Sequence, residues 1–229
     1  MNETVIVVTG AAPLRPRAVD AVPPGSIVIA ADGALDCALA AGLQPAALVG
    51  DLDSVSDAGL AWAEDHATID RHDPDKEHTD TELALATAVG LDPDRIVLLS
   101  GGGDRLDHSL AAIGALGAPR LTSVPTIDGI WGVQRFAVLH GPGRTRLDVA
   151  VGTTISLLAL HGACEGVTTT GLRWPLESAT LEPMSGLGVS NVADAATVEI
   201  SLTARVLTVF VNDHLNDRPS DHLSEETTT

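Results

Sequence analysis

Aromatic residues are scarce in this sequence. They make up 2% of its 229 residues, and tyrosine is absent altogether. Because hydrophobic residues still make up 45% of the chain, we expect it to fold around a core rather than stay disordered. That core must consist mainly of alanine, valine, leucine and isoleucine. The length suffices for one large domain or two small ones.

Basic residues are also few. The chain has 13 lysines and arginines against 31 aspartates and glutamates, which gives a net charge of −18 at pH 7. A general nucleic-acid binder needs a basic surface to replace the counterions of the phosphates, so we expect no nucleic-acid partner. An acidic protein can still bind a nucleotide where lysine, arginine, a helix N-terminus or Mg²⁺ supplies local positive charge.

The sequence lacks the features of secreted and membrane proteins. Its two cysteines, Cys37 and Cys164, lie too far apart for a disulfide framework or a zinc site. No apolar run approaches the roughly 18 residues of a membrane span. The first residues lead directly into a short apolar run and lack the basic region of a signal peptide. We therefore expect a cytoplasmic protein that contacts no membrane.

Short apolar runs alternate with helical patterns in the first part of the chain. Runs that end at glycine or aspartate are typical of buried parallel strands, and the alternation predicts an α/β domain. We expect a Rossmann-like domain with a mostly parallel sheet over residues 1–133. The predicted strands are 4–8, 26–31, 46–49 and 95–99, and the predicted helices are 34–41, 57–64, 79–89 and 107–116.

The pattern changes after residue 133. Short strand candidates with turn signals between them predict an all-β antiparallel sandwich over residues 134–212. In it we expect Trp174 to pack in the core rather than to offer a stacking surface, because aromatic residues are so few. Residues 213–229 are polar and acidic, and we expect a disordered tail. The strand candidates are 134–139, 144–149, 154–160, 166–169, 188–191, 197–200 and 205–211.

Polar residues follow several of the predicted strands. Ligands of open α/β sheets bind beyond the carboxyl ends of the strands, so Asp32, Asp51 and residues 101–103 should meet at one edge. Asp51 and Asp53, two positions apart, are a common way to hold a hard cation such as Mg²⁺. The alternative is a turn with solvated aspartates and a helix cap.

An acidic segment precedes the third predicted helix. Residues 73–82 contain five carboxylates and one lysine, and such repulsion is costly unless a cation binds or water solvates the segment. Thr79 and Glu82 fit a capping box, and the first turn of a helix is also a phosphate site. Lys76 can contact a phosphate.

A glycine-rich loop follows the fourth predicted strand. Backbone N–H groups at Gly102 and Gly103 can approach a ligand closely, and Arg105 can contact a phosphate with two prongs. The alternative is that Asp107 is only the N-cap of the next helix and His108 a polar first-turn residue. A metal site, Lys76 and this loop together supply the parts that phosphoryl transfer needs.

These motifs resemble those of the thiamine pyrophosphokinase family over nearly the whole chain, from Val5 to about Val211. Three positions depart from the family pattern, namely Glu77, Asp104 and Val192. The motifs that carry the resemblance are Ala31-Asp32-Gly33, Gly50-Asp51-Leu52-Asp53-Ser54, Lys76-Glu77-His78-Thr79-Asp80, Gly103-Asp104-Arg105-Leu106-Asp107-His108, Gly171-Leu172-Arg173-Trp174-Pro175-Leu176 and Ser190-Asn191.

The resemblance implies a homodimer with its active site between subunits, and Mg²⁺-dependent transfer of a diphosphoryl group from ATP to the hydroxyl of thiamine. The products would be thiamine diphosphate and AMP. Ser190 and Asn191 of one chain would lie near the thiamine. The implied catalytic residues are Asp51, Asp53, Asp80 and Arg105, of which the aspartates would hold the metal. The implied nucleotide-binding residues are Asp32, Gly33, Lys76, Thr79, Gly102, Gly103, Arg105, Asp107 and His108.

The departures keep two alternatives open. Val192 stands where many bacterial members have glutamate, which admits a pyrophosphokinase for another small alcohol such as a pterin. Glu77 and Asp104 admit a non-catalytic sensor of nucleotides or thiamine phosphates on the same scaffold. These departures leave the charge argument for thiamine intact, because its cationic thiazolium ring suits an acidic site. In the thiamine reaction, Asp80 or Asp51 could accept the proton of the attacking hydroxyl.

Overall fold

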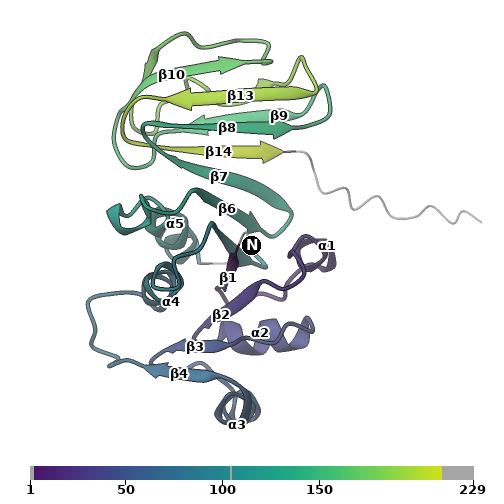
Figure 1. Ribbon diagram of the computed structural model, residues 1–229, viewed down its shortest axis with the longest axis vertical. Helices are drawn as coiled ribbons and strands as arrows, with labels where there is room; N and C mark the ends of the chain where they lie inside the picture. Colours follow the sequence, from purple (N-terminus) through teal and green to yellow (C-terminus); the bar gives the residue numbers. More distant parts are fainter. Residues whose placement is uncertain (1–2, 104, 213–229) are drawn as a thin grey trace, which may run out of the picture.

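An α/β part and a β-sandwich follow one another along the chain (Figure 1). The structure is a computed structural model, and it describes residues 3–103 and 105–212. Asp104 and the expected disordered tail at 213–229 lie outside the described residues. The predicted fold class, a mostly parallel α/β sheet followed by an antiparallel sandwich, is confirmed.

One ten-stranded sheet runs through both parts, in the order β12-β9-β14-β7-β6-β5-β1-β2-β3-β4. Pairing is parallel from β6 to β4 and antiparallel from β6 to β12. The sheet continues without a break from its parallel to its antiparallel strands, so the domain boundary at residue 133 stays a prediction. The bounds are β1 (Thr4–Val8), β2 (Ile27–Ala31), β3 (Ala47–Gly50), β4 (Thr68–Arg71), β5 (Arg95–Ser100), β6 (Thr126–Trp131), β7 (Gln134–His140), β9 (Thr154–Leu158), β12 (Asn191–Val192) and β14 (Val206–Asn212).

Helices cover both faces of the parallel part of the sheet. Val5 and Val7 face α4 and α5, whereas Ile6 and Val8 face α1 and α2, as the alternation of side chains along a strand requires. Burial on both faces explains why these strands read as unbroken apolar runs. The helices are α1 (Pro16–Asp20), α2 (Ala34–Ala40), α3 (Asp57–His66), α4 (Asp80–Val89), α5 (Leu106–Ala115) and the 3₁₀ helix η1 (Pro119–Leu121).

A second sheet completes the sandwich. It has the order β11-β10-β13-β8 and packs against β9, β14 and β7 of the long sheet. Buried aliphatic residues such as Leu157, Val198 and Val209 fill the space between the two sheets. The expected core of small and aliphatic residues is therefore confirmed. The remaining strands are β8 (Gly143–Asp148), β10 (Cys164–Thr170), β11 (Ala179–Leu181) and β13 (Thr197–Leu202).

Trp174 does not pack in this core. Its side chain is 58% exposed, so the expectation that it is a core residue is wrong. The aliphatic residues fill the sandwich without it. Among residues 3–103 and 105–212, no helix combines the length and the apolar character that a membrane crossing requires. The cytoplasmic location stays a prediction.

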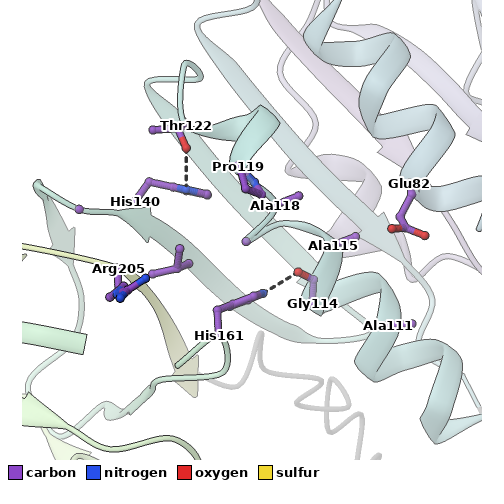
Figure 2. Close-up of a pocket in the computed structure, with 13 residues that line it drawn as sticks. Glu82, Ala111, Gly114, Ala115, Ala118, Pro119, Thr122, His140, His161 and Arg205 are labelled. Atoms are coloured by element: carbon purple, nitrogen blue, oxygen red, sulfur yellow. Dashed lines mark hydrogen bonds between the residues drawn. The ribbon is translucent and has the colours of Figure 1, made fainter. Parts of the chain in front are cut away.

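Two histidines of the sandwich hold the end of helix α5. His161 Nε2 lies 2.6 Å from the carbonyl oxygen of Gly114, and His140 Nε2 lies 2.9 Å from that of Leu116. A carbonyl oxygen only accepts, so each Nε2 donates to a carbonyl at the helix end. The Gly114 carbonyl also accepts from the Gly117 N–H at 3.0 Å, so His161 is an additional donor there. These contacts line a cavity of about 720 Å³ between the two parts (Figure 2). Its described lining has a single carboxylate, Glu82, so we place the candidate site elsewhere.

Candidate active site

The candidate site lies at the carboxyl edge of the parallel strands. Loops that follow β1, β2, β3 and β5 meet there around a cavity of about 450 Å³. The sequence correctly predicts that these loops share one edge, because parallel strands all end on the same side of the sheet. The lining residues that the sequence singles out are Asp32, Gly33, Lys76, Thr79, Asp80, Gly102, Gly103, Arg105 and His108.

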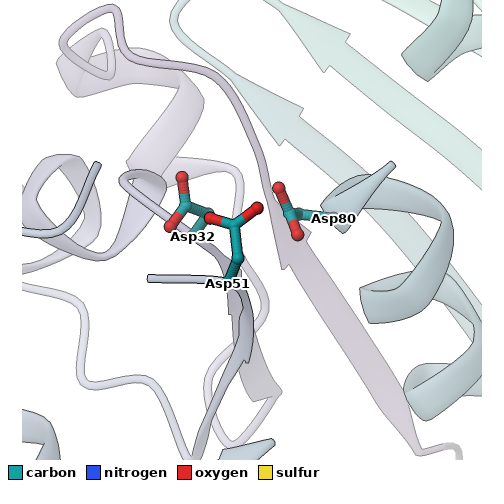
Figure 3. A group of neighbouring side chains, drawn as sticks. All are labelled: Asp32, Asp51 and Asp80. Atoms are coloured by element: carbon teal, nitrogen blue, oxygen red, sulfur yellow. The ribbon is translucent and has the colours of Figure 1, made fainter. Parts of the chain in front are cut away.

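Three carboxylates form a cluster at this edge. One oxygen atom from each of Asp32, Asp51 and Asp80 lies within 4.8 Å of the others (Figure 3). Asp32 Oδ1 is buried and makes no hydrogen bond among the described residues, and Asp80 Oδ1, also buried, has only the Lys76 ammonium 3.0 Å away. Buried carboxylate oxygens without donors are costly, and a hard divalent cation would satisfy them. The donor set therefore fits Mg²⁺.

Asp53 does not join this cluster. Its carboxylate accepts a hydrogen bond of 2.8 Å from Ser54 Oγ, and the residue is exposed. Leu52, between Asp51 and Asp53, has a φ of +70°. The third carboxylate of the cluster is Asp32, at the end of β2, and not Asp53 as the sequence suggested. The metal-binding roles of Asp51, Asp53 and Asp80 stay predictions.

Lys76 lies against two of the clustered carboxylates. Its Nζ donates to Asp51 Oδ2 at 2.7 Å and forms an ion pair with Asp80 Oδ1 at 3.0 Å. Its side chain is 13% exposed. Burial lowers the pKa of Lys76, but the contacts with Asp51 and Asp80 outweigh burial and raise it overall. The ammonium is therefore charged at neutral pH.

The carboxylates have different proton affinities. Burial, together with the charges of Asp80 and Asp51, raises the pKa of Asp32 above its usual value. The hydrogen bond from Lys76 and that from the Asp53 backbone N–H lower the pKa of Asp51. One cluster thus contains a carboxylate with a lowered pKa and one with a raised pKa. A bound cation would relieve the repulsion between them.

Gly50 allows the cluster to form. Its φ is +153°, and a Cβ at this position would lie 3.0 Å from Asp32 Cβ and 3.0 Å from Asp80 Oδ1. Any larger residue would push the carboxylates apart. Asp32 itself has a φ of +49°, which is uncommon for a residue other than glycine. The backbone is thus held in unfavourable conformations where the carboxylates converge, a recurrent feature of functional sites.

Helix α4 positions Asp80. Thr79 Oγ1 accepts from the Glu82 N–H at 3.2 Å, and the Glu82 carboxylate accepts from the Thr79 N–H at 2.9 Å. The predicted capping box is therefore confirmed. It fixes the start of the helix, and Asp80 is the first helical residue. Behind it, the buried hydroxyls of Thr9 and Thr81 share a hydrogen bond of 2.6 Å.

The glycine loop after β5 faces the carboxylates across the cavity. A Cβ at Gly101 would lie 2.3 Å from the carbonyl oxygen of Pro13, so the loop packs too closely for a side chain there. Gly102 has a φ of +95°, which favours glycine. Backbone N–H groups of this loop and the first turn of the ten-residue helix α5 can therefore face an anion.

Arg105 and Asp107 pair at the start of helix α5. The two side chains approach to 2.6 Å, and Arg105 holds the pKa of Asp107 down to about 2. Asp107 is not the N-cap, as the alternative for this motif proposed, because the helix begins one residue earlier and Arg105 occupies that position. Asp107 is also absent from the described lining of the cavity, whereas Arg105 and His108 belong to it.

The sequence interpretation missed part of the cavity wall. Thr9, Gly10 and Ala11 line it from the end of β1, and Trp131 lines it from the end of β6. The edge rule that identified Asp32 also applies to Thr9 and Gly10, so it could have found them. Trp131 could not be found in this way, because β6 was not predicted.

Comparisons with known proteins identify the scaffold. A family model described as the catalytic domain of thiamin pyrophosphokinase matches residues 22–126, and one described as its vitamin B1 binding domain matches residues 144–207. The chain belongs to the thiamine pyrophosphokinase family. The thiamine pyrophosphokinase of Bacillus subtilis is 29% identical over 157 residues, which are 67% of this chain and 72% of that protein. Membership implies a kinase-type transferase.

Solved structures of thiamine pyrophosphokinases share the fold. The Bacillus subtilis enzyme has a TM-score of 0.78 and 24% identity, with 93% of this chain and 100% of that chain covered. The Candida albicans enzyme has a TM-score of 0.73 and 16% identity, with 93% and 90% covered. At such low identity these likenesses show a common architecture, which includes both matched regions.

The predicted acceptor residues lie in the region that matches the vitamin B1 binding domain. Ser190 donates its backbone N–H to Ser156 Oγ at 3.0 Å and has a φ of +59°. Asn191 is 4% exposed and directs its side-chain amide to the backbone of Trp174. Neither residue belongs to the described lining of the cavity at the carboxyl edge of the same chain. Their roles in substrate binding stay predictions.

Proposed function

We propose that this chain transfers the β,γ-diphosphoryl group of ATP to the hydroxyl of thiamine, in a Mg²⁺-dependent reaction that yields thiamine diphosphate and AMP. The observation that carries the proposal is the cluster of Asp32, Asp51 and Asp80. Asp32 and Asp80 line the same cavity as the glycine-rich loop, and Asp32 Oδ1 is buried without a hydrogen-bond donor among the described residues. Family membership favours thiamine as the acceptor.

Asp51 and Asp80, with Asp32 beside them, would hold the cation. When bound, Mg²⁺ supplies charge neutralisation for the phosphates and polarises the phosphoryl group. Asp53 stays a predicted ligand, although its carboxylate bonds to Ser54. The N–H groups of Gly102 and Gly103, the guanidinium of Arg105 and the ammonium of Lys76 line the same cavity and would bind the triphosphate.

In the proposed reaction the hydroxyl oxygen of thiamine attacks the β-phosphorus, and the bond from that phosphorus to the α,β-bridging oxygen breaks. The departing AMP carries the negative charge of that bond, and a carboxylate of the cluster accepts the hydroxyl proton. Arg105 and the N-terminus of α5 neutralise the charge that develops on the transferred group. The site acts chiefly by positioning and electrostatics.

A second copy of the chain would complete the acceptor pocket. Ser190 and Asn191 lie in the sandwich rather than at the cavity of their own chain. Around them Trp174 is 58% exposed, and the β11–β12 loop exposes Met184, Leu187 and Val189 by 69%, 53% and 44%. Exposed apolar residues of this kind mark interaction surfaces. We therefore propose a homodimer in which the sandwich of one chain offers Trp174 to thiamine bound at the other.

The test is to incubate the purified protein with ATP, Mg²⁺ and thiamine and to identify the products. We expect AMP and thiamine diphosphate in equal amounts, whereas release of ADP would overturn the proposal. Asp51→Asn and Asp53→Asn form a matched pair, because both change one carboxylate of the same motif. Asp51→Asn should lower kcat by about a hundredfold or more, since one carboxylate of the proposed cation site is lost. Asp53→Asn should lower it less.

The same assay separates the two alternatives. A pyrophosphokinase for a pterin-like alcohol would release AMP with that acceptor in preference to thiamine. A non-catalytic sensor would bind Mg²⁺ and ATP without releasing AMP with any acceptor. Light scattering or analytical ultracentrifugation would test the proposed dimer, and a monomer that is fully active would exclude a shared site.

A further inference from the structure

Lys76 is the single lysine among the 13 lysines and arginines of this chain. Its ammonium lies 2.7 Å from Asp51 Oδ2 and 3.0 Å from Asp80 Oδ1. These two residues also supply oxygens to the three-carboxylate cluster. A monovalent ammonium therefore sits on the ligands that the proposed function assigns to a divalent cation.

Both oxygens of Asp51 are engaged in this arrangement. Oδ2 accepts from Lys76, and Oδ1 accepts from the Asp53 backbone N–H at 3.2 Å. Each carboxylate oxygen can accept a second ligand, so a cation could bind Asp51 Oδ2 either beside the Lys76 ammonium or in its place. An ammonium and a divalent cation at adjoining positions repel one another strongly in a partly buried site. Lys76 and a free cation thus compete for the same oxygens.

We propose that Lys76 is a positioning residue that occupies the cation site of the nucleotide-free protein and leaves it only when the phosphates of a nucleotide draw its ammonium away. Free divalent cations would then bind poorly, and cation and nucleotide would bind together. The inference rests on the proposed function, because it assumes that the cluster binds the cation of a nucleotide complex.

The chemistry of lysine suits this exchange. An ammonium is a compact charge with three donors on a flexible stem, whereas a guanidinium is a rigid planar fork. Lys76 precedes helix α4, whose first turn is fixed by the capping box of Thr79 and Glu82. The side chain can therefore move from the carboxylates to a phosphate while Asp80 stays in place. The carboxylates are thus paired with positive charge both in the nucleotide-free protein, where Lys76 supplies it, and in the nucleotide complex, where the cation supplies it.

The first test measures Mn²⁺ affinity without nucleotide, by electron paramagnetic resonance of the free ion. We expect Lys76→Met to bind free Mn²⁺ roughly tenfold more tightly than the wild type, because Asp51 and Asp80 are left without their ammonium. Lys76→Arg should restore weak binding. Arg146→Met removes one positive charge from an exposed position in β8 and should leave the affinity unchanged.

The same titration is repeated with a non-hydrolysable ATP analogue. In the wild type the analogue should raise the Mn²⁺ affinity strongly, and in Lys76→Met it should raise it much less, because part of the coupling is release of the ammonium. Equal or weaker binding of free Mn²⁺ by Lys76→Met would overturn the inference. Since no acceptor is present, this result does not depend on whether thiamine is the substrate.

A second test uses the wild type alone. Labelling with isotopic lysine gives one side-chain signal, because the sequence contains one lysine. We expect that signal to keep its position with millimolar Mg²⁺ and to shift when Mg²⁺ and the ATP analogue are added together. A signal that shifts with Mg²⁺ alone, or with neither addition, would contradict the exchange. If the lysine signal behaves in either of these two ways while the product assay still yields AMP and thiamine diphosphate, the inference is rejected and the proposed function stands.

Discussion

The side-chain amide of Asn191 holds both backbone groups of Trp174. Nδ2 donates to the Trp174 carbonyl at 2.6 Å, and Oδ1 accepts from the Trp174 N–H at 3.2 Å. Asn191 is 4% exposed and Trp174 is 58% exposed. A buried amide therefore fixes the backbone that presents an exposed aromatic ring, and Arg173 adds a cation over that ring at 5.7 Å.

A comparison of Asn191→Ala with Trp174→Ala should separate effects on stability from effects on acceptor binding. The substitution leaves backbone groups of Trp174 without partners, so we expect the free energy of unfolding to fall by about 1–3 kcal/mol. The KM for thiamine should rise because the ring loses its fixed position. Trp174→Ala, which removes an exposed ring, should raise the KM with little change in stability. Urea unfolding and steady-state kinetics test both, and an unchanged KM in Trp174→Ala would contradict stacking on this ring.

Gly50→Ala should damage the carboxylate cluster specifically. The new Cβ would lie 3.0 Å from Asp32 Cβ and 3.0 Å from Asp80 Oδ1, so the carboxylates must move. Mn²⁺ affinity with the ATP analogue present should fall by about tenfold, as expected when the carboxylate ligands are displaced by a fraction of an ångström.

Gly42→Ala is the matched control for Gly50. Gly42 also has an unusual φ, +78°, but a Cβ there would meet no atom within 4 Å. Both variants should lose about 1 kcal/mol of stability from backbone strain. Only Gly50→Ala should lose cation affinity, and equal losses in the two variants would show that strain rather than collision is responsible.

The apolar and turn patterns predicted most strands of both parts of the chain, and they missed β4 and β6 for physical reasons. Strand β4 lies at the edge of the sheet and is mostly exposed, so its sequence carries no apolar run. Strand β6 contains Asp128, which pairs with Arg95, and Gly129, whose missing side chain makes room for the ring of Phe136. Both features depend on tertiary contacts that local sequence does not reveal.

The carboxylate cluster was predicted in part. The rule that parallel strands end together placed Asp32 and Asp51 at one edge, and the capping box placed Asp80 at the start of α4. The sequence could not show that Asp53 faces Ser54, because this follows from the positive φ of Leu52, a conformation that leucine rarely adopts.

Glu82→Gln should reveal the stabilising charge of the capping box. Burial raises the pKa of Glu82, but the N–H and hydroxyl of Thr79 outweigh it, so the pKa lies below its usual value of 4.5. A lowered pKa means that the stabilisation is fully present above pH 4.5 and is lost as the pH falls through the pKa of the folded state. The wild type should be more stable than Glu82→Gln at pH 7, and the difference should shrink as the solution is acidified.

Urea unfolding at several pH values between neutral and about 3 measures that difference, because the loss begins near pH 4.5 and continues through the lower pKa of the folded state. Glu64→Gln, an exposed position on α3, serves as the control and should change stability little at any pH. If the difference between wild type and Glu82→Gln were the same at all pH values, the carboxylate charge would not be the stabilising feature of the box.

Gly117→Ala and Gly114→Ala should have opposite effects on stability. A Cβ at Gly117 would lie 2.2 Å from His161 Nε2, the atom that donates to the Gly114 carbonyl. The ring would have to move, and this hydrogen bond between sandwich and helix α5 would break. We expect the free energy of unfolding to fall by about 1–3 kcal/mol, as for other overpacked sites.

Gly114 lies within α5, and a Cβ there would meet no atom within 4 Å. Alanine favours the helix over glycine by up to about 1 kcal/mol, so Gly114→Ala should raise stability. Both variants add one methyl group near the same junction, and denaturant unfolding compares them directly. Loss of stability in both would mean that α5 tolerates no added volume at its end, whereas loss in Gly117→Ala alone would show that the His161 contact holds the two parts of the chain together.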